Sequence, residues 1–363
     1  MNNKIFVDND IRIAETLPAE FYKKEEFFEM VKEKIFLRCW HWIGDESMIS
    51  EKNLTLPINL YPEFLDEPII IISDEKNDIS FFSNVCTHRG NILVKEKCIS
   101  KKITCSYHGR RFNNKGVFEF MPEFKETNNF PRECDNLHKF PSYNWKKLLF
   151  LGLNPEFQIE DVLNKIENRI GFLPLDDIKP DLKLSKDYYI DANWALYCDN
   201  YLEGFHVPFV HKDLNEVLDY KNYHTEIDNF FNLQIGYGKN KSECFEIPES
   251  HKDFGKNIAA YYYWIFPNLM LNFYPWGISI NLVCPLSKSK TKILFRSYVF
   301  NKSKLNLGAS GDLDKVEMED EEIVQNVQKG IKSSFYSTGR FSPSMEKGVH
   351  HFHSLISRFL NNK

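Results

Sequence analysis

The chain has 363 residues, 42% of them hydrophobic and 15% aromatic, which is enough for two domains with large cores. Its formal net charge of −5 gives no overall positive field that would favour nucleic acid. Residues 1–15 lack the apolar segment of a secretory signal, and the longest apolar runs are too short to cross a bilayer. We therefore expect a cytoplasmic protein that binds neither nucleic acid nor membrane, with its eight cysteines reduced or holding metal.

The first half of the chain predicts a small all-β module. An amphipathic helix over 24–37 comes first, and Trp40 and Trp42 then mark a first strand. Short strands separated by turn residues follow over 69–72, 79–84, 103–105, 117–120 and 148–153. We expect an N-terminal segment at 1–38 that packs on the larger domain, and the β module at 39–153.

The second half predicts a larger catalytic domain over 154–363. A polar connection over 154–186 contains one helical stretch, 159–170. Strands are predicted at 261–266, 269–275, 278–284 and 292–300, with the turn signal Pro267-Asn268 between the first two. Helices over 316–333 and 345–360 close the chain. The predicted fold class is α+β, with an antiparallel sheet flanked by helices in this domain.

Two cysteine–histidine pairs carry the strongest chemical signal in the sequence. Cys86 and His88 form one pair, Cys105 and His108 form the other, and a glycine follows each histidine. Two thiolates and two imidazoles are the ligand set of a Rieske 2Fe-2S cluster, with cysteines on one iron and histidines on the other. A zinc site uses the same ligand types, but the mixed Cys-x-His order is not typical of zinc fingers or ribbons.

The residues beside these ligands indicate the type of Rieske centre. High-potential respiratory Rieske proteins resemble this motif but carry an additional disulfide-bonded cysteine in each loop. Asn91 and Ser106 occupy those places here. The motif therefore resembles the oxygenase or ferredoxin type. The stretch 86–116 also holds eight basic residues and one acid, which suggests a docking patch for an acidic electron donor; Lys101 and Lys102 are its test positions.

A second candidate metal site lies in residues 193–211. His206 and His211 are five residues apart, and on an unbroken helix their rings would diverge. We expect Pro208 to turn the chain after Val207, so that both imidazoles can share one metal. Two histidines and one carboxylate form the facial triad of non-haem Fe(II) oxygenases. Glu203 could be the carboxylate ligand or could orient His206 through a hydrogen bond.

These motifs together resemble the catalytic α subunit of Rieske non-haem iron oxygenases over nearly the whole chain. The similarity is greatest to the choline and carnitine monooxygenase branch. It is carried by residues 86–90, 105–109, 200–211, 266–276, 319–320 and 328–330. The resemblance implies a homotrimer in which His108 of one subunit meets Glu203 of the next, so that Glu203 is an inter-subunit electron bridge. Asn200 is a further catalytic candidate.

The resemblance also implies that Asp320 is the third ligand of the mononuclear iron. The sequence by itself does not choose among the acidic residues of 317–322, since carboxylates at a helix start also stabilise its dipole. We expect the ligand to point inward with Val324 and Val327.

Two departures from the family are Arg110, in place of a frequent tryptophan, and Ser106, in place of a frequent proline. Arg110 is expected to affect donor docking, and Ser106 to tune the cluster.

The substrate pocket is expected to be aromatic. The predicted substrate-binding residues are Tyr201, Phe205, Tyr263, Trp264 and Phe273. Aromatic faces bind quaternary ammonium groups by cation–π attraction, although an aromatic substrate would also stack on them, and an ordinary β core explains many such residues. Alternation along a strand allows Tyr261 and Tyr263, or Tyr262 and Trp264, to line the pocket, but not all four.

The predicted function is the terminal oxygenase of a multicomponent system that uses O2. A C–H bond of a small molecule would be hydroxylated, by monooxygenation or oxidative demethylation. Because no flavin or nicotinamide motif is visible, electrons from NAD(P)H must come through a separate flavin/iron–sulfur reductase or ferredoxin. An aromatic ring-hydroxylating dioxygenase is one alternative. A Rieske electron carrier or a structural zinc protein are alternatives of other classes, which a metal count would separate.

Overall fold

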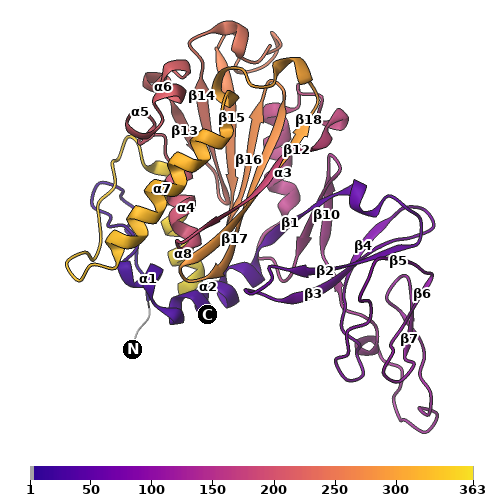
Figure 1. Ribbon diagram of the computed structural model, residues 1–363. Helices are drawn as coiled ribbons and strands as arrows, with labels where there is room; N and C mark the ends of the chain where they lie inside the picture. The colour runs from indigo at the N-terminus through magenta and orange to yellow at the C-terminus, as the bar shows by residue number, and fades with distance from the viewer. Residues whose placement is uncertain (1–3, 363) are drawn as a thin grey trace. The chain divides into compact units, whose positions relative to one another are not determined.

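The computed structural model describes residues 4–362 and divides the chain into two compact units. One unit comprises residues 37–159, and the other combines the N-terminal residues up to 36 with residues from 160 onward. Figure 1 shows the β-rich smaller unit in violet, and the larger unit in indigo for its N-terminal helices and from magenta to yellow for the rest. None of the helices in the described residues is long and apolar enough to cross a membrane.

The smaller unit is built from three antiparallel sheets. A five-stranded sheet has the order β5-β2-β3-β4-β9, and two three-stranded sheets have the orders β1-β11-β10 and β6-β7-β8. The strands are β1 (Trp40–Asp45), β2 (Leu54–Leu60), β3 (Glu67–Ser73), β4 (Ile79–Ser83), β5 (Cys98–Ile99), β6 (Lys102–Thr104), β7 (Arg111–Asn113), β8 (Phe118–Phe120), β9 (Lys139–Phe140), β10 (Ser142–Trp145) and β11 (Leu148–Gly152). The short strands predicted here are confirmed.

The apolar core of this unit reaches the predicted cluster ligands. Ile70, Ile72, Phe82, Ile103 and Phe112 pack in one cluster that also contains the side chains of both ligand cysteines. Because a close-packed core fixes the side chains at its edge, the two cysteine loops start from rigid positions.

The larger unit is organised around one antiparallel sheet of seven strands. The strand order is β12-β18-β17-β16-β15-β14-β13, with mostly hairpin connections. The strands are β12 (Lys179–Ile190), β13 (His224–Ile227), β14 (Phe231–Tyr237), β15 (Ile258–Ile265), β16 (Leu269–Tyr274), β17 (Gly277–Ser287) and β18 (Lys290–Val299). This sheet confirms the α+β class. The sequence predicts a polar connection for most of the 12 residues of β12, whereas the structure forms a strand there. The strand was missed because an exposed edge strand carries no apolar alternation.

Helices lie on both faces of this sheet. They are α1 (Ala19–Lys23), α2 (Glu25–Lys34), α3 (Ile159–Ile170), α4 (Trp194–Tyr201), α5 (Val207–Val210), α6 (Lys212–Val217), α7 (Leu313–Ile331) and α8 (Lys347–Asn361). Arg169 of α3 stacks on Tyr261 from one face of β15. Phe352 of α8 packs on Trp264 of the same strand, whose ring also meets Phe266. Helices α4 and α7 contact each other in Figure 1, and the second candidate site lies where they meet.

Candidate metal centres and cavity

The two cysteine loops of the smaller unit share one hydrogen-bond pattern. In the first loop, the N–H of Cys86 donates to the carbonyl of Asn91 at 2.8 Å, and the N–H of Gly90 donates to the carbonyl of Cys86 at 3.0 Å. In the second loop, the N–H of Cys105 donates to the carbonyl of Arg110 at 2.7 Å, and the N–H of Gly109 donates to the carbonyl of Cys105 at 3.0 Å. Both glycines have positive φ, +71° and +73°, which explains the glycine after each histidine.

The four predicted cluster ligands lie at the tips of these loops. The cysteines are buried, and the rings of His88 and His108 are partly exposed with centroids 4.9 Å apart. Nδ1 of His108 is buried and has no hydrogen-bond partner among the described residues. An imidazole nitrogen left in this way, next to two thiols, fits a metal ligand. Nδ2 of Asn91 also lies 3.5 Å from Sγ of Cys105, where it can donate to a ligand sulfur.

Arg110 lies inside the smaller unit, which contradicts its expected part in donor docking. Only 1% of the residue is exposed, and its guanidinium pairs with Asp135 at 2.8 Å. The same guanidinium lies over the rings of Phe118 and Phe130, at 5.0 and 5.4 Å from their centroids. A side chain buried in this way cannot contact another protein. Its position after Gly109 did not reveal this, because Asp135 is distant in the sequence.

Four of the other seven basic residues of the expected docking patch face nearby acids. Lys97 pairs with Glu51 and Lys101 with Glu75, while Lys102 and Arg111 both approach Glu119. These exposed pairs each contribute little to stability, but they reduce the positive field that the sequence suggested. The docking patch stays a prediction, supported by fewer unpaired charges than the sequence indicated.

In the larger unit, His206 and His211 flank the single-turn helix α5. Helix α4 ends at Tyr201, and the chain changes direction over 202–206, before Pro208 and not after Val207 as predicted. Pro208 instead occupies the first turn of α5, where its missing N–H costs nothing. The two histidines cap opposite ends of this turn, and their side chains therefore reach the same point.

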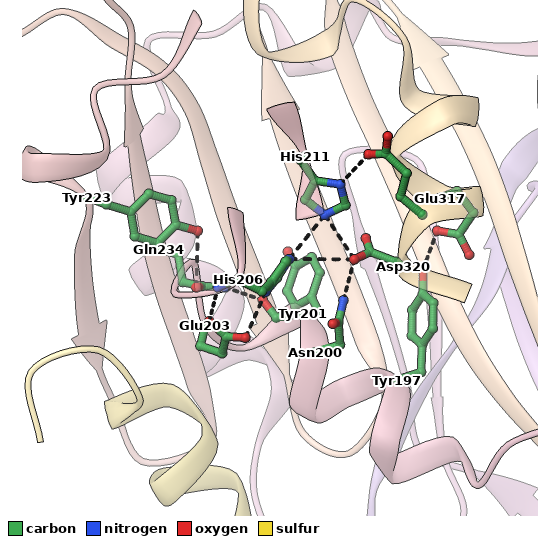
Figure 2. Close-up of polar contacts among 11 residues, drawn as sticks. Tyr197, Asn200, Tyr201, Glu203, His206, His211, Tyr223, Gln234, Glu317 and Asp320 are labelled. Carbon is green, nitrogen blue, oxygen red and sulfur yellow. Dashed lines mark hydrogen bonds and ion pairs between the residues drawn. The ribbon is translucent and has the colours of Figure 1, made fainter. Parts of the chain in front are cut away.

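Three ligand atoms converge on that point. The Nε2 atoms of His206 and His211 are 3.2 Å apart, and Oδ1 of Asp320 lies 3.5 Å from the first and 3.0 Å from the second. Asp320 comes from α7, on the far side of the site in Figure 2. Among the described residues these are the one group of three potential ligands brought together in this way. Two imidazoles and a carboxylate on one side of a point fit a mononuclear iron.

The carboxylates around this point orient the histidines. Oε1 of Glu203 accepts from Nδ1 of His206 at 2.7 Å, and Oε2 of Glu319 accepts from Nδ1 of His211 at 2.7 Å. Each contact keeps the proton on Nδ1 and leaves Nε2 free for a metal. Burial lowers the pKa of His211, but the contacts with Asp320 and Glu319 outweigh burial and hold that pKa above its usual value.

Asn200 completes the group from α4. Its Nδ2 donates to Oδ1 of Asp320 at 2.6 Å and so restrains the carboxylate.

No orienting role was predicted for Glu319 from the sequence. Asp320 lies four residues before the buried Val324, a spacing that marks the inward face of α7. Val327, which was expected to share that face, is 44% exposed.

A cavity of about 120 Å³ opens beside the three converging ligands. Its walls combine aromatic rings with short polar side chains. They comprise Tyr197, Asn200, Tyr201, Glu203, His206, Val207, His211, Leu214, Leu218, Tyr223, Gln234, Tyr262, Asn272, Tyr274, Ser279, Asn281, Phe295, Ala309, Leu313, Val316, Glu317 and Asp320. Tyr201 is anchored there by its hydroxyl, which donates to Oδ1 of Asn272 at 2.7 Å.

The structure places the other four predicted substrate-binding residues away from this cavity. Tyr263 and Phe273 are neighbours across β15 and β16 on the opposite face, because side chains alternate along a strand. Trp264 shares the cavity-facing side of β15 with Tyr262 but lies two residues further along the strand, where α8 covers it. Phe205 is 41% exposed and does not line the wall. Tyr262 and Tyr274 take their places.

Each of the two sites lies in a region that matches a family model. The family model "Rieske [2Fe-2S] domain" matches residues 39–131, and the model "Ring hydroxylating alpha subunit (catalytic domain)" matches residues 176–362, about half of the chain. The chain belongs to the ring-hydroxylating α-subunit family. It is a Rieske non-haem iron oxygenase, which confirms the family predicted from the sequence and, with it, the 2Fe-2S and mononuclear iron cofactors.

Relatives of this oxygenase with curated names are similar over nearly its full length. The chloroplastic choline monooxygenase of Arabidopsis thaliana is 28% identical, covering 94% of this chain and 82% of that protein. The carnitine monooxygenase oxygenase subunit of Escherichia coli (strain K12) is 27% identical, covering 95% of this chain and 94% of that protein.

Solved oxygenase structures share the fold. The quaternary ammonium Rieske monooxygenase CntA, in complex with its substrate γ-butyrobetaine, has a TM-score of 0.73 and 22% identity, covering 96% of this chain and 97% of that one. Naphthalene 1,2-dioxygenase from a Rhodococcus species, bound to indole, has a TM-score of 0.71 and 19% identity, covering 95% and 93%.

Proposed function

We propose that this chain is the terminal oxygenase that hydroxylates a C–H bond of a quaternary ammonium compound, with electrons from a separate flavin/iron–sulfur reductase or ferredoxin. The observation that carries the proposal is the wall of the cavity beside His206, His211 and Asp320. That wall includes five tyrosine rings, from Tyr197, Tyr201, Tyr223, Tyr262 and Tyr274. Electron-rich ring faces attract a cation that cannot form hydrogen bonds, by up to about 2 kcal/mol per desolvated contact.

Two sets of residues would hold the cofactors. Cys86, His88, Cys105 and His108 would bind the 2Fe-2S cluster, and His206, His211 and Asp320 would bind the mononuclear iron. When bound, the cluster supplies electrons one at a time and the iron supplies the activation of O2 that breaks a C–H bond. The side chains described below would position these ligands and the substrate.

The ligand-orienting contacts belong to α4, α7 and the turn before α5. Glu203 and Glu319 would hold the Nδ1 protons of the two histidines, so that both Nε2 atoms stay available. The amide of Asn200 would keep Asp320 turned toward the histidines. These contacts are made by charged or amide groups in a partly closed site, where hydrogen bonds hold geometry well.

Glu203 is also our proposed inter-subunit electron bridge. Its Oε1 accepts from the ring of His206 and its Oε2 from the backbone N–H of the same residue, and the side chain remains 13% exposed. In a homotrimer, His108 of a neighbouring subunit would approach Glu203 from outside. Phe205 and Phe209, exposed by 41% and 75% beside His206, form an apolar surface that such a neighbour would cover.

Oxygen uptake tests the substrate class. The protein would be purified without oxygen, checked for about three irons and two acid-labile sulfides per chain, and combined with a reductase that reduces its cluster. We expect O2 uptake and product with choline-like or carnitine-like compounds and not with naphthalene. Formaldehyde release would identify N-demethylation. Turnover of naphthalene without turnover of any quaternary ammonium compound would contradict the proposal.

A further inference from the structure

The cavity wall has acidic side chains but no lysine or arginine among the described residues. Within the described part of the chain, its lining includes the carboxylates of Glu203, Glu317 and Asp320, and neither a lysine nor an arginine. Glu203 is engaged with His206, and Asp320 with both histidines and Asn200. Glu317 contacts none of these, so its charge is not explained by the metal site.

Glu317 is buried with one oxygen unused. The residue is 3% exposed and lies on α7, one turn before Asp320. Oε2 accepts a hydrogen bond from the hydroxyl of Tyr197 at 2.6 Å, as Figure 2 shows, while Oε1 is buried without a partner. Buried polar atoms in native proteins nearly always have a partner, since leaving one without any costs about 1–3 kcal/mol. Glu317 lines the cavity, and an unpartnered oxygen on a lining residue points to a ligand.

Among the described residues, none of the main influences on the Glu317 carboxyl is a positive charge. Burial raises the pKa of this carboxyl well above its usual range, and the nearby carboxylates Asp320, Glu321 and Asp314 act in the same direction. The Tyr197 hydroxyl opposes them. A cation in the cavity would favour the ionised form and would supply the missing partner.

We infer that Glu317 is the counter-ion that recognises the cationic nitrogen of the substrate, and that the substrate is an organic cation without a carboxylate. This inference rests on the proposed function and adds the recognition group. Glu317 and Asp320 are three residues apart, about 4.5 Å along the helix axis. A cation held at Glu317 therefore lies within about one turn of the iron ligands, and carbons close to the nitrogen face the reaction site.

The missing lysine and arginine give the second half of the inference. A carnitine-like substrate carries a carboxylate that must be buried together with its ammonium group. Burying that anion without a cationic or multiple hydrogen-bonding partner is costly, and the acidic wall would repel it. A choline-like substrate needs only a hydroxyl partner, which Asn272, Asn281 and Ser279 can provide at the wall.

Ligand binding without turnover tests this assignment. Affinities for choline, for its neutral carbon isostere 3,3-dimethyl-1-butanol and for carnitine would be measured by calorimetry on the iron-loaded protein without reductase or oxygen. We expect choline to bind more tightly than both others. Glu317→Gln, which keeps size and a contact for Tyr197, should weaken choline about 30-fold or more and leave the isostere unchanged.

Two controls separate charge from structure. Glu322→Gln removes a charge from an exposed position of the same helix and should change neither affinity. Tyr197→Phe removes the hydrogen bond to Glu317 but keeps the carboxylate, so the preference for choline over the isostere should persist. If Glu317→Gln does not fold, the comparison of choline with its isostere in the unmodified protein still measures the charge preference.

The outcomes distinguish this inference from the proposed function. Equal binding of choline and its isostere, unchanged choline affinity in Glu317→Gln, or tighter binding of carnitine would overturn the role of Glu317 while a quaternary ammonium substrate stands. If no quaternary ammonium compound binds the unmodified protein, both the inference and the proposed function are wrong.

Discussion

Glu319 accepts a hydrogen bond from Nδ1 of His211 at 2.7 Å. The same arrangement, at the same distance, joins Glu203 to His206. The two histidines are thus each held by a carboxylate on the side away from the point where their Nε2 atoms meet. One carboxylate comes from the turn after α4 and the other from α7, so the histidine pair is fixed from two directions.

Glu319→Ala should weaken the binding of the mononuclear iron. Loss of an orienting carboxylate typically lowers metal affinity by about 10–100-fold, because the imidazole loses its preferred tautomer and orientation. The measurement is the iron that remains after dialysis against a graded chelator, with sulfide as an internal count of cluster. Glu322→Ala, on the same helix but exposed, is the matched control. Equal iron retention in both variants would rule out the role of Glu319.

Glu203→Gln should keep both metals and lose nearly all turnover. The substitution retains size and a hydrogen-bonding group at His206, so the metal site stays formed, but the charged contact proposed for the neighbouring His108 is removed. Iron, sulfide and the visible spectrum would be compared with O2 uptake. Glu216→Gln, an exposed carboxylate on α6, serves as control. Full turnover coupled to product in Glu203→Gln would exclude the electron-bridge role.

Asp320→Ala should remove the mononuclear iron and spare the cluster. Its Oδ1 is the one carboxylate oxygen, among the described residues, that approaches both Nε2 atoms. We expect iron to fall from about three to about two per chain with sulfide unchanged at about two. Glu321→Ala, one position along the helix, should retain all the iron. If Glu321→Ala instead loses it, the third ligand has been misassigned.

Asn91→Ala should lower the reduction potential of the cluster. A hydrogen bond to a ligand sulfur stabilises the reduced, more negative state, and the Asn91 amide lies 3.5 Å from Sγ of Cys105. A redox titration followed in the visible spectrum would measure the shift. Asn113→Ala, in β7 away from both cysteines, is a control within the same unit. An unchanged or raised potential would contradict this contact.

Asp135→Asn should destabilise the smaller unit in a pH-dependent way. Burial raises the pKa of Asp135, but the contacts with Arg110 and the N–H of Arg132 outweigh burial and hold it below its usual value. Because the pKa of Asp135 is lower in the folded than in the unfolded state, its carboxylate stabilises the fold at pH values above the unfolded pKa, near pH 4. This stabilisation is lost as the pH falls through the folded pKa.

The loss in Asp135→Asn should therefore be about 3 kcal/mol at pH 7 and shrink below pH 4. Urea unfolding at several pH values, followed by tryptophan fluorescence, would compare the variant with the unmodified protein. Glu133→Gln, an exposed neighbour in the same turn, should show no such trend. A loss that stays constant down to pH 3 would show that the carboxylate charge is not what stabilises the unit.

The family and the metal ligands with regular spacing were determined by the sequence alone. The pairs Cys86/His88 and Cys105/His108, each followed by glycine, are local patterns, and the loops that they form close through hydrogen bonds within five residues. The helix predicted over 159–170 and the strands 261–266 and 269–275 are also close to the observed elements, because periodicity records which side chains are buried.

Contacts between distant segments were decided only by the tertiary structure. Asp320 and Glu319 are adjacent acids, and which of them meets the two Nε2 atoms depends on how α7 rotates against α4. Tyr262 lines the cavity while Tyr263 does not, because one residue of register exchanges the two faces of a strand. Arg110 is buried because Asp135 and three phenylalanines surround it. Such long-range packing leaves no periodic pattern in the sequence, so the pocket was not predictable. The ligands that belong to local motifs were predictable, because their spacing is visible in the sequence.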